Sequence, residues 1–492
     1  MKLFIFVIFL LMINPLTQAK TLKIGSKNFT ESYILAEIMA QLAEKVGEAS
    51  VVRKFGLGGT GITFQALEKS EIDLYPEYTG TISEAILKKP VLKDWKSIKE
   101  SLENENLQIS LGLGFNNTYA LAMNKEQLAK LGLSKLSQLK KHNSLTSAFS
   151  HEFVQRKDGL KNLSLHYGFK LKNVKAMEHS LAYQALSDGK VDLVEVYSTD
   201  AKIEKYDLVL LEDDLNYFPS YLAVIFSRSD FEENFPLTYQ SFEQNLIGKI
   251  DNKTMTKLNA LVELEGYSFS QAAKYFLQGK LVKSKISLWD WDKILLRTKE
   301  HMALVFISLA LAIIIGIPLG VISAQNKYLG QFLLGANALI QTIPSLALLC
   351  LLIPFFGIGP KPATFALFLY ALLPIVRGTF TGLKSIDLKL KESAILMGLT
   401  RLQLLRFILL PLASPSIMSG IKTSAIINVG TATLAAFIGA GGLGQIIVTG
   451  LALNDQQMIL QGAIPAGILA VAVHIFFELI DKWIVPVALR RN

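Results

Sequence analysis

Cysteine is almost absent from this chain, and its histidines are scattered. Cys350 is the single cysteine among 492 residues, so no disulfide can form within the chain. No histidine has the spacing of a metal ligand, and we expect each on the surface or in the core: His142, His151, His166, His179, His301 and His474. No pairing of a nucleophile with a base stands out either. These absences disfavour an enzyme and predict neither catalytic residues nor a metal site.

A phosphate-binding lysine is also missing. The segment Gly56–Thr63 reads GLGGTGIT and has the glycine spacing of a P-loop, but Ile62 stands where the lysine would be. The segment Gly439–Gln445, GAGGLGQ, lacks that lysine as well. A dinucleotide site at Gly56–Thr63 is a weak alternative, because no suitable acidic residue in a clear βαβ unit accompanies the glycines. We expect a glycine-rich turn that opens a helix, whose backbone N–H groups can face a ligand, and no cofactor in this chain.

Charge and hydrophobicity divide the chain into two unlike halves. Residues up to about 295 are mixed and charged, whereas long apolar runs dominate from about 300 onward. Residues 1–19 combine a short positive region, an apolar stretch and small residues before Lys20, which is typical of a secretory signal peptide. An uncleaved membrane anchor is the alternative, and both predict that the following residues are exported. The formal net charge of +9 comes partly from loops between the apolar runs, so we expect no nucleic-acid partner.

The second half contains five apolar segments, each near the roughly 20 residues that cross about 30 Å of hydrocarbon. They are His301–Ala324, Gln331–Phe355, Pro362–Leu383, Pro411–Phe437 and Met458–Trp483. Lysine and arginine gather between the third and fourth segments and at the chain end, which places both regions in the cytoplasm. An odd number of crossings then leaves the start of the first span outside. We therefore expect a multi-pass protein of the inner (cytoplasmic) membrane, with its N-terminal half on the periplasmic or extracellular side.

The connection between the third and fourth segments has a distinctive pattern. Residues 392–411, ESAILMGLTRLQLLRFILLP, predict a helix, a turn at Gly398 and a second helix before the next span. From the residues alone, an amphipathic helix at the membrane interface is an equal alternative. The pattern resembles the coupling motif of binding-protein-dependent ABC permeases and departs from it only at Ser393, where that family has alanine. The matching residues are Glu392, Ser393, Ala394, Gly398, Ile408, Leu410 and Pro411.

The resemblance implies that this coupling elbow, residues 392–411, docks into a groove on a cytoplasmic ATPase. Because the chain carries no P-loop, we expect ATP and magnesium on a separate ABC ATP-binding subunit. Permeases of this type work in pairs, so the resemblance implies a homodimer embedded in membrane lipid. A membrane-anchored, ligand-sensing receptor is the alternative from another class. It would need a signalling domain after the last span, where the sequence given has only Trp483–Asn492.

The exported half alternates short β-like runs with helical patterns over residues 21–280, which predicts an α/β architecture with largely parallel strands. It resembles, over essentially its whole length, the substrate-binding proteins of the glycine betaine/choline/proline betaine uptake family. The resemblance rests on the segments GSKNFTESYILAEI, GLGGTG, DLYPEYTGT, GFNNTYALAM, YSTDAKI and LLEDDLNYFPSYLA. It implies a two-lobed, type II periplasmic-binding-protein-like domain, with one lobe at about 21–113 and 222–280 and the other at about 114–220.

The two resemblances together imply a fusion. We expect a substrate-binding domain at 20–280, a linker at 281–295 and an all-α transmembrane permease domain of about five helices at 296–492. Trp289 and Trp291 in the linker suit a membrane interface. A short linker holds the binding domain over its own translocation path at high effective concentration.

Two tyrosines lie close together in DLYPEYTGT, Asp73–Thr81, in a segment too polar for a core. A quaternary ammonium has no N–H to donate, whereas aromatic faces attract a diffuse cation by about 0.5–2 kcal/mol per ring. Carried over from the family motif by motif, the cation-binding cage is Tyr78, Tyr119, Tyr197 and Tyr221. Half-buried scaffold residues are the alternative for each of them. We expect Tyr75 and Tyr217 to be scaffold residues.

A cage alone does not distinguish choline from glycine betaine, because only the betaine has a carboxylate. Lys27 and Arg156 match family positions that bind this carboxylate, and Thr81 can add a hydroxyl. Arginine is suited to bidentate pairing with a carboxylate, although a solvated charge in a polar loop is the alternative for Arg156. Since Lys27 and Arg156 fall in different lobes, our hypothesis is that a carboxylate between them triggers closure.

Glu195, two positions before Tyr197, introduces a further alternative. If it faces the cleft, its negative charge favours ligands with more cationic character or an extra hydrogen-bond donor. The expected cargo is a compatible solute (osmoprotectant) of the glycine betaine or proline betaine type. Carnitine and ergothioneine stay open as alternatives, and choline is less favoured while both Lys27 and Arg156 are present.

Overall fold

The computed structural model describes residues 20–89, 92, 94–281, 289–453 and 455–485. The predicted signal peptide, residues 1–19, and residues 282–288 of the predicted linker lie outside the described residues. Two compact units divide the chain. We call residues 20–55 and 59–281 the N-terminal unit and residues 289–485 the helical unit.

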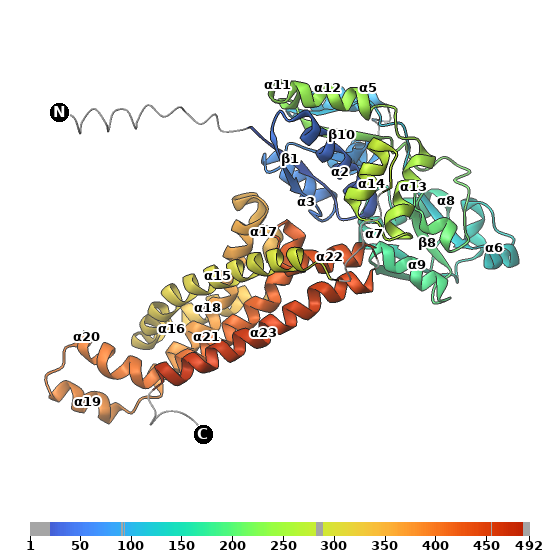
Figure 1. The fold of residues 1–492 in the computed structure, drawn as a ribbon. Coiled ribbons are helices and arrows are strands. Elements are labelled where there is room, and N and C mark those ends of the chain that lie inside the picture. Colours follow the sequence, from blue (N-terminus) through green and yellow to red (C-terminus); the bar gives the residue numbers. More distant parts are fainter. Residues whose placement is uncertain (1–19, 90–91, 93, 282–288, 454, 486–492) are drawn as a thin grey trace, which may run out of the picture. The chain divides into compact units, whose positions relative to one another are not determined.

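The first sheet of the N-terminal unit has five strands in the order β2-β1-β3-β10-β4 (Figure 1). β1 pairs parallel with β2 and β3, while β10 pairs antiparallel with β3 and β4. All five residues of the central strand β3 are buried, as expected for a strand covered on both faces. The strands are β1 (Thr21–Gly25), β2 (Ser50–Lys54), β3 (Leu74–Tyr78), β4 (Leu107–Ile109) and β10 (Ala223–Arg228).

The second sheet also has five strands, in the order β7-β6-β8-β5-β9. β6 pairs parallel with β7 and β8, and β5 pairs antiparallel with β8 and β9. Both sheets are therefore mixed rather than largely parallel, while the predicted two-sheet α/β fold is confirmed. The strands are β5 (Tyr119–Asn124), β6 (Thr146–Ser150), β7 (Asn173–Met177), β8 (Leu193–Tyr197) and β9 (Leu208–Leu210).

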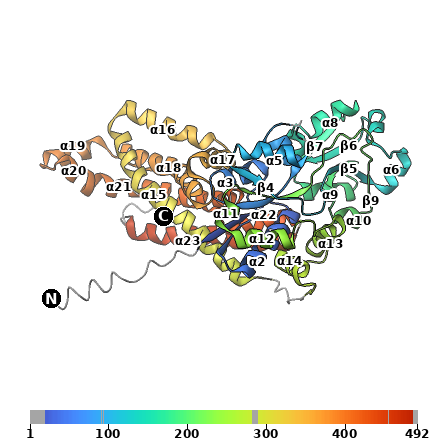
Figure 2. The ribbon, with the colours of Figure 1, turned by 90° about the horizontal axis from the view of Figure 1, so that it is seen from above.

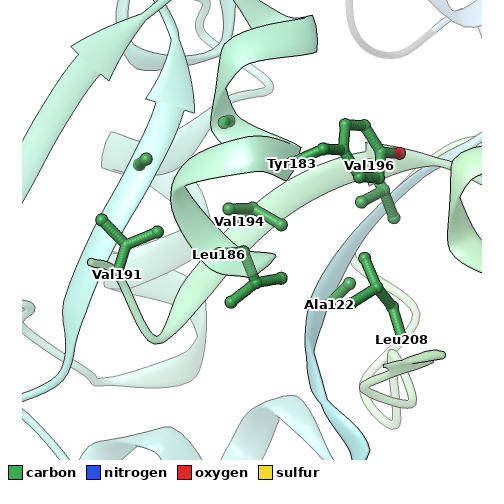
Figure 3. Close-up of a cluster of buried hydrophobic side chains, with 9 residues drawn as sticks. Ala122, Tyr183, Leu186, Val191, Val194, Val196 and Leu208 are labelled. Carbon is green, nitrogen blue, oxygen red and sulfur yellow. The ribbon is translucent and has the colours of Figure 1, made fainter. Parts of the chain in front are cut away.

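Helices lie against the sheets of the N-terminal unit (Figure 2). Behind the second sheet, Tyr183 and Leu186 of one helix pack on Val194 and Val196 of β8 (Figure 3). These helical elements are α2 (Thr30–Val46), α3 (Thr60–Glu68), α4 (Thr79–Thr81), η1 (Ile82–Ile86), α5 (Trp95–Glu103), α6 (Lys125–Leu131), η2 (Leu136–Lys141), α7 (His151–Gln155), α8 (Leu160–Tyr167), α9 (His179–Ser187), α10 (Lys202–Lys205), α11 (Phe231–Asn234), α12 (Pro236–Asn245), α13 (Asn252–Glu263) and α14 (Phe269–Gln278).

The chain crosses between the two sheets twice, after β4 and after β9. The crossing segments pair with each other through a bridge between Asn116 and Leu222. The backbone N–H of Asn117 donates to the Tyr221 carbonyl at 3.0 Å, and the Tyr221 N–H donates to Asn116 Oδ1 at 2.7 Å. This paired hinge divides the unit into a first lobe around the first sheet and a second lobe around the second sheet.

The helical unit has four helices long and apolar enough to span a membrane among the described residues, or five if one bent pair counts as a span. The predicted second segment is that bent pair, because α16 and α17 meet at a bend of 100°. α15 begins at Trp291, so the end of the segment expected to be a linker is helical. The elements are α15 (Trp291–Gln325), α16 (Lys327–Thr342), α17 (Ser345–Phe356), α18 (Pro360–Lys384), α19 (Leu388–Leu396), α20 (Arg401–Leu404), η3 (Leu405–Leu409), α21 (Leu410–Ala432), η4 (Thr433–Ile438), α22 (Leu443–Leu453) and α23 (Gln456–Ile484).

Small residues bring the central helices of this unit together. A Cβ built on Gly420 of α21 would stand 2.4 Å from the carbonyl oxygen of Pro374, and one on Gly378 of α18 would stand 2.5 Å from that of Ser416. Pro374 leaves the carbonyl of Tyr370 without a helical donor, and Gln341 of α16 supplies one at 2.9 Å. Close backbone approach and replaced hydrogen bonds are what helices need when they pack inside a membrane.

Candidate functional site

A small cavity of about 40 Å³ lies between the two lobes of the N-terminal unit. All seven residues predicted to bind ligand line it, which brings together side chains from six separate segments of the sequence. The lining residues are Lys27, Asn28, Phe29, Gly59, Tyr78, Thr81, Asn117, Tyr119, Glu152, Arg156, Tyr197 and Tyr221. Tyr75 and Tyr217, predicted to be scaffold residues, are not among them.

The four predicted tyrosines form a connected group of rings around this cavity. The Tyr119 centroid lies 5.3 Å from that of Tyr197 and 5.4 Å from that of Tyr221, the latter edge-on. Phe29 joins the group at 5.8 Å from Tyr197 and 6.3 Å from Tyr78. Sequence reasoning missed Phe29, although it stands in the motif that supplied Lys27. Converging aromatic faces of this kind attract a diffuse cation.

Strand ends and the hinge position these rings. Tyr119 begins β5 and Tyr197 ends β8, and the two are direct partners across the antiparallel pair. Tyr78 ends β3, while Tyr221 lies beside the start of β10. A Cβ on Gly80 would stand 2.6 Å from the Tyr221 ring, so the glycine of Thr79-Gly80-Thr81 is needed for this ring to lie where it does.

Buried carboxylates accept hydrogen bonds from the hydroxyl groups of two cage tyrosines. The Tyr78 hydroxyl donates to Glu31, and the Tyr221 hydroxyl donates to Asp158 at 2.6 Å. Burial, with the nearby carboxylates adding to it, raises the pKa of both phenols well above the ordinary value. The rings therefore stay neutral over the physiological range, and their faces remain available to a cation.

Lys27 lies at the cavity as predicted, but it already has an anionic partner. Its Nζ donates to Glu77 Oε1 at 2.6 Å, and Glu77 is completely buried. The same Nζ stands 5.6 Å from the Phe29 ring and 5.4 Å from the Tyr78 ring. An ammonium has three donors, so Lys27 can still donate to a ligand carboxylate. Its positive charge, however, is already balanced by Glu77. Glu77 lies inside DLYPEYTGT, and sequence reasoning did not single it out.

Arg156 also has carboxylate partners of its own. Its Nε donates to Asp158 Oδ1 at 2.7 Å, its Nη2 donates to Asp158 Oδ2, and its Nη1 donates to Glu152 Oε1 at 3.3 Å. A guanidinium has five N–H donors, so these bonds leave two for another acceptor. Its Cζ stands 5.6 Å from the Tyr119 ring. The side chain is a buried part of the cleft rather than a solvated charge in a loop.

Direct bonds between the lobes close the cavity. Thr60 Oγ1 at the start of α3 donates to Glu152 Oε1 of α7 at 2.9 Å. Gly59 precedes α3 and lines the cavity, so the glycine-rich segment opens a helix beside the candidate site, as predicted. Thr81 in α4 is buried and lines the same cavity. The structure therefore has the lobes in a closed arrangement.

Glu195 does not face the cleft, so the ligand preference predicted for that case does not apply. It is completely buried, and both of its oxygens accept the backbone N–H of Ser150, at 2.8 and 2.9 Å. His179 Nδ1 lies 3.3 Å from Glu195, and its Nε2 lies 3.0 Å from Asp200. Burial opposes the charged imidazolium, but these two carboxylates raise the pKa of His179 to about 10. The centroid of its ring lies 4.4 Å from that of Tyr197, with the two ring planes tilted by 32°.

The predicted coupling elbow is a helix-turn-helix in the helical unit (Figure 1). Glu392, Ser393 and Ala394 lie on α19, Gly398 takes the left-handed φ of +85° in the turn, and the last three residues lie where η3 meets α21: Ile408, Leu410 and Pro411. Leu396 and Met397 at its tip are 88% and 81% exposed. Large apolar side chains exposed together mark a surface that another molecule covers.

Among the residues that the structure describes, no three histidine, cysteine, aspartate or glutamate side chains are placed to hold a metal ion.

Two family models match this chain. "Substrate binding domain of ABC-type glycine betaine transport system" matches residues 20–279, and "Binding-protein-dependent transport system inner membrane component" matches residues 316–488. The first covers more than half of the chain. Together they describe a binding and permease subunit that is not itself an ATPase.

Individual relatives match parts of the chain. The chain is 40% identical over 199 residues to the choline transport system permease protein OpuBB of Bacillus subtilis, which covers 40% of this chain and 92% of that protein. It is 35% identical over 266 residues to the ergothioneine transport permease/ergothioneine binding protein EgtU of Helicobacter pylori, covering 53% of this chain and 48% of that protein. A solved structure of a glycine betaine/carnitine/choline ABC transporter aligns with 28% identity and a TM-score of 0.46, over 52% of this chain and 98% of that one.

The two family models agree with the division of the chain into an N-terminal unit and a helical unit. The chain belongs to the glycine betaine/choline family of ABC importers, as an extracytoplasmic substrate-binding domain fused to a multi-pass membrane permease domain.

Proposed function

We propose that this chain imports a zwitterionic compatible solute of the glycine betaine or proline betaine type. The observation that supports this best is the convergence of Tyr78, Tyr119, Tyr197 and Tyr221 on one cavity that Arg156 also lines. The rings attract the methylated nitrogen, and the two remaining N–H groups of Arg156 receive the carboxylate. Thr81 adds a hydroxyl.

The proposed cycle begins when solute enters between the lobes and favours their closure. A closed binding unit then presents the solute to the permease. A separate ABC ATP-binding subunit engages the elbow, residues 392–411, and its ATP cycle alternates access of the permease to the two sides. We propose that the chain acts as a homodimer, so that two elbows meet two ATPase subunits.

The pairing of both cleft cations favours a second candidate, a cationic solute such as choline. Lys27 is bonded to Glu77 and Arg156 to Asp158, so neither contributes an unbalanced positive charge to the cavity. Glu152 lines the cavity as well and adds a carboxylate. Carnitine and ergothioneine carry both a quaternary nitrogen and a carboxylate, so they belong to the zwitterionic class of the first candidate. One relative is named as an ergothioneine transporter.

Calorimetry on the purified full-length protein tests the proposal. The ligands are glycine betaine, proline betaine, carnitine, ergothioneine, choline and plain amino acids. We expect binding of the betaines and none of the amino acids. Choline binding without a response to glycine betaine would transfer the assignment to the second candidate, and binding of amino acids alone would refute both.

Arg156→Ala tests the role of the carboxylate. The variant should lower the affinity for glycine betaine by about tenfold to a hundredfold, the range of a charge-assisted hydrogen bond. The affinity for choline should change little. Unchanged affinity for glycine betaine would refute the closure trigger.

Reconstitution with and without an ABC ATP-binding subunit distinguishes an importer from a ligand-sensing receptor, because only an importer needs that subunit for uptake.

A further inference from the structure

Glu31, near the start of α2, is a buried carboxylate that the proposed function leaves without a role. It is 3% exposed and does not line the cavity. It is the second residue of α2 and belongs to the same motif that supplies Lys27 and Phe29 to the cleft. A buried carboxylate costs free energy unless hydrogen bonds satisfy it, so its partners indicate what it is for.

Four side-chain donors converge on Glu31. Oε1 accepts from the Tyr78 hydroxyl and from Asn117 Nδ2 at 2.9 Å. Oε2 accepts from Thr199 Oγ1 at 2.6 Å and from Asn259 Nδ2 at 3.1 Å. An ionised carboxylate has about four acceptor sites, so this set saturates it. Burial raises the pKa of Glu31, and the hydrogen bonds from Thr199, Tyr78 and Asn259 oppose that rise.

The donors come from different parts of the closing unit. Tyr78 ends β3 of the first lobe, Asn259 lies on α13, and Asn117 lies in the hinge. Thr199 follows β8 and belongs to the second lobe. Two further bonds tie Thr199 to the same group: its N–H donates to Asn117 Oδ1 at 3.4 Å, and its carbonyl accepts from Asn259 Nδ2 at 3.0 Å.

Separation of the lobes would take Thr199 away from Glu31 and leave one oxygen with a single protein donor. Closure supplies the missing donor inside a buried site, where a hydrogen bond to a charged group contributes most. The opposite oxygen meanwhile holds the hydroxyl of Tyr78, whose ring is a wall of the cage. One rigid carboxylate thus contacts a ring that faces the ligand and a residue that arrives with the other lobe.

We propose that Glu31 is a positioning residue that links the placement of the Tyr78 ring to closure of the lobes, so that the cage is complete only in the closed state. This inference rests on the proposed function for its ligand, but the closure that it describes can be measured without one. Glu31 does not touch the ligand, and its effect is transmitted through Tyr78 and Thr199.

The test measures the distance between the lobes in the full-length protein by double electron–electron resonance. Spin labels are attached through Lys69→Cys in the first lobe and Lys130→Cys in the second, both exposed, in a Cys350→Ser background. The variants are Glu31→Gln and Thr199→Val. Glu37→Gln is the matched control, because Glu37 is a buried carboxylate on the same helix with its own partners, Gln41 and Arg53.

We expect Glu31→Gln and Thr199→Val to shift the ligand-free distances toward the open form, and Glu37→Gln to leave them unchanged. With the ligand that the wild type binds, Glu31→Gln should weaken affinity by about tenfold to a hundredfold, chiefly through faster dissociation. Adding Thr199→Val to Glu31→Gln should then change little, because the two act through one bond. Tyr78→Phe, which keeps the ring and loses the bond, should also weaken binding.

Interlobe distances of Glu31→Gln that coincide with the wild type, both with and without ligand, would overturn the inference. A wild type that binds no quaternary ammonium compound would refute the proposed function, and the ligand-free distances would still decide the role of Glu31. The two failures are therefore distinguishable.

Discussion

The N-terminal unit and the helical unit fill their interiors with different chemistry. The N-terminal unit buries charges in pairs and networks, such as Lys27 with Glu77 and His179 between Glu195 and Asp200. The helical unit brings backbones together through glycines such as Gly378 and Gly420. A unit that opens and closes in water can use bonds that form between lobes, whereas helices in lipid gain from close backbone packing. Specificity and closure are thus expected in one unit, and the translocation path in the other.

The largest effect is expected from breaking the helical packing. Gly420→Ala would place a Cβ 2.4 Å from the Pro374 carbonyl oxygen, a contact that side-chain rotation cannot relieve. We expect uptake in reconstituted vesicles to fall to background, with ligand binding by the N-terminal unit retained. Gly430→Ala on the same helix is the control, because its Cβ would meet nothing within 4 Å. Equal uptake by both variants would contradict the packing argument.

The next largest effect is expected at the centre of the cage. Tyr119 contacts the rings of Tyr197 and Tyr221 and the guanidinium of Arg156. Tyr119→Leu should weaken binding of a quaternary ammonium by about tenfold or more, since a cation–π contact is lost together with packing. Tyr119→Phe keeps the ring and should bind nearly as the wild type does. Calorimetry of the two variants checks this. Normal binding by Tyr119→Leu would contradict the proposal that the rings bind the cation.

Sequence and structure agree best where a motif fixes a local shape. The four tyrosines, Lys27 and Arg156 could be placed at one site because each occurs in a short segment that resembles a binding motif of the family, and all six line one cavity. Their partners could not be predicted, since Glu31 receives bonds from residues up to 228 positions away. Such partners are set by how the lobes fold together. The orientation of Glu195 could not be predicted either, because alternation along β8 does not show which face of the strand meets the cleft.

The structure of the helical unit could also be predicted only in part. Hydropathy located the apolar segments, but it did not show the 100° bend between α16 and α17. The residues at the bend, Ile343 and Pro344, separate α16, which contains several polar residues, from the more apolar α17. A proline disfavours helical backbone at the residue before it. The angle of the bend, however, depends on the tertiary contacts of each helix.

A smaller effect is expected on the pH dependence of stability, through the buried His179 of the N-terminal unit. The pKa of His179 is raised to about 10 in the folded protein, from an ordinary value near 6.5. Because the folded value is higher, the imidazolium contributes its full stabilisation below about pH 6.5 and loses it as the pH rises through about 10. Thermal unfolding should show this decline, and His179→Gln should reduce it. The exposed His151→Gln is the control; an unchanged pH profile in the His179 variant would contradict the assignment.

The smallest effect is expected at the elbow. Gly398 has a φ of +85°, in the left-handed region that costs a residue with a Cβ about 1–2 kcal/mol. Gly398→Ala should lower uptake and ATP hydrolysis by the partner ATPase a few-fold while leaving ligand affinity unchanged. Gly335→Ala, which adds a Cβ in open space within α16, should leave both activities unchanged. A loss of ligand affinity in the Gly398 variant would argue against a role confined to the ATPase.

The central claim is that the rings select a positive charge and not merely a shape. Tert-butylacetate tests it most directly, because it has the shape and carboxylate of glycine betaine but carries carbon in place of the quaternary nitrogen. Titration of the full-length protein in a calorimeter should give binding of glycine betaine and none of tert-butylacetate. Equal affinity for the two compounds would contradict the account.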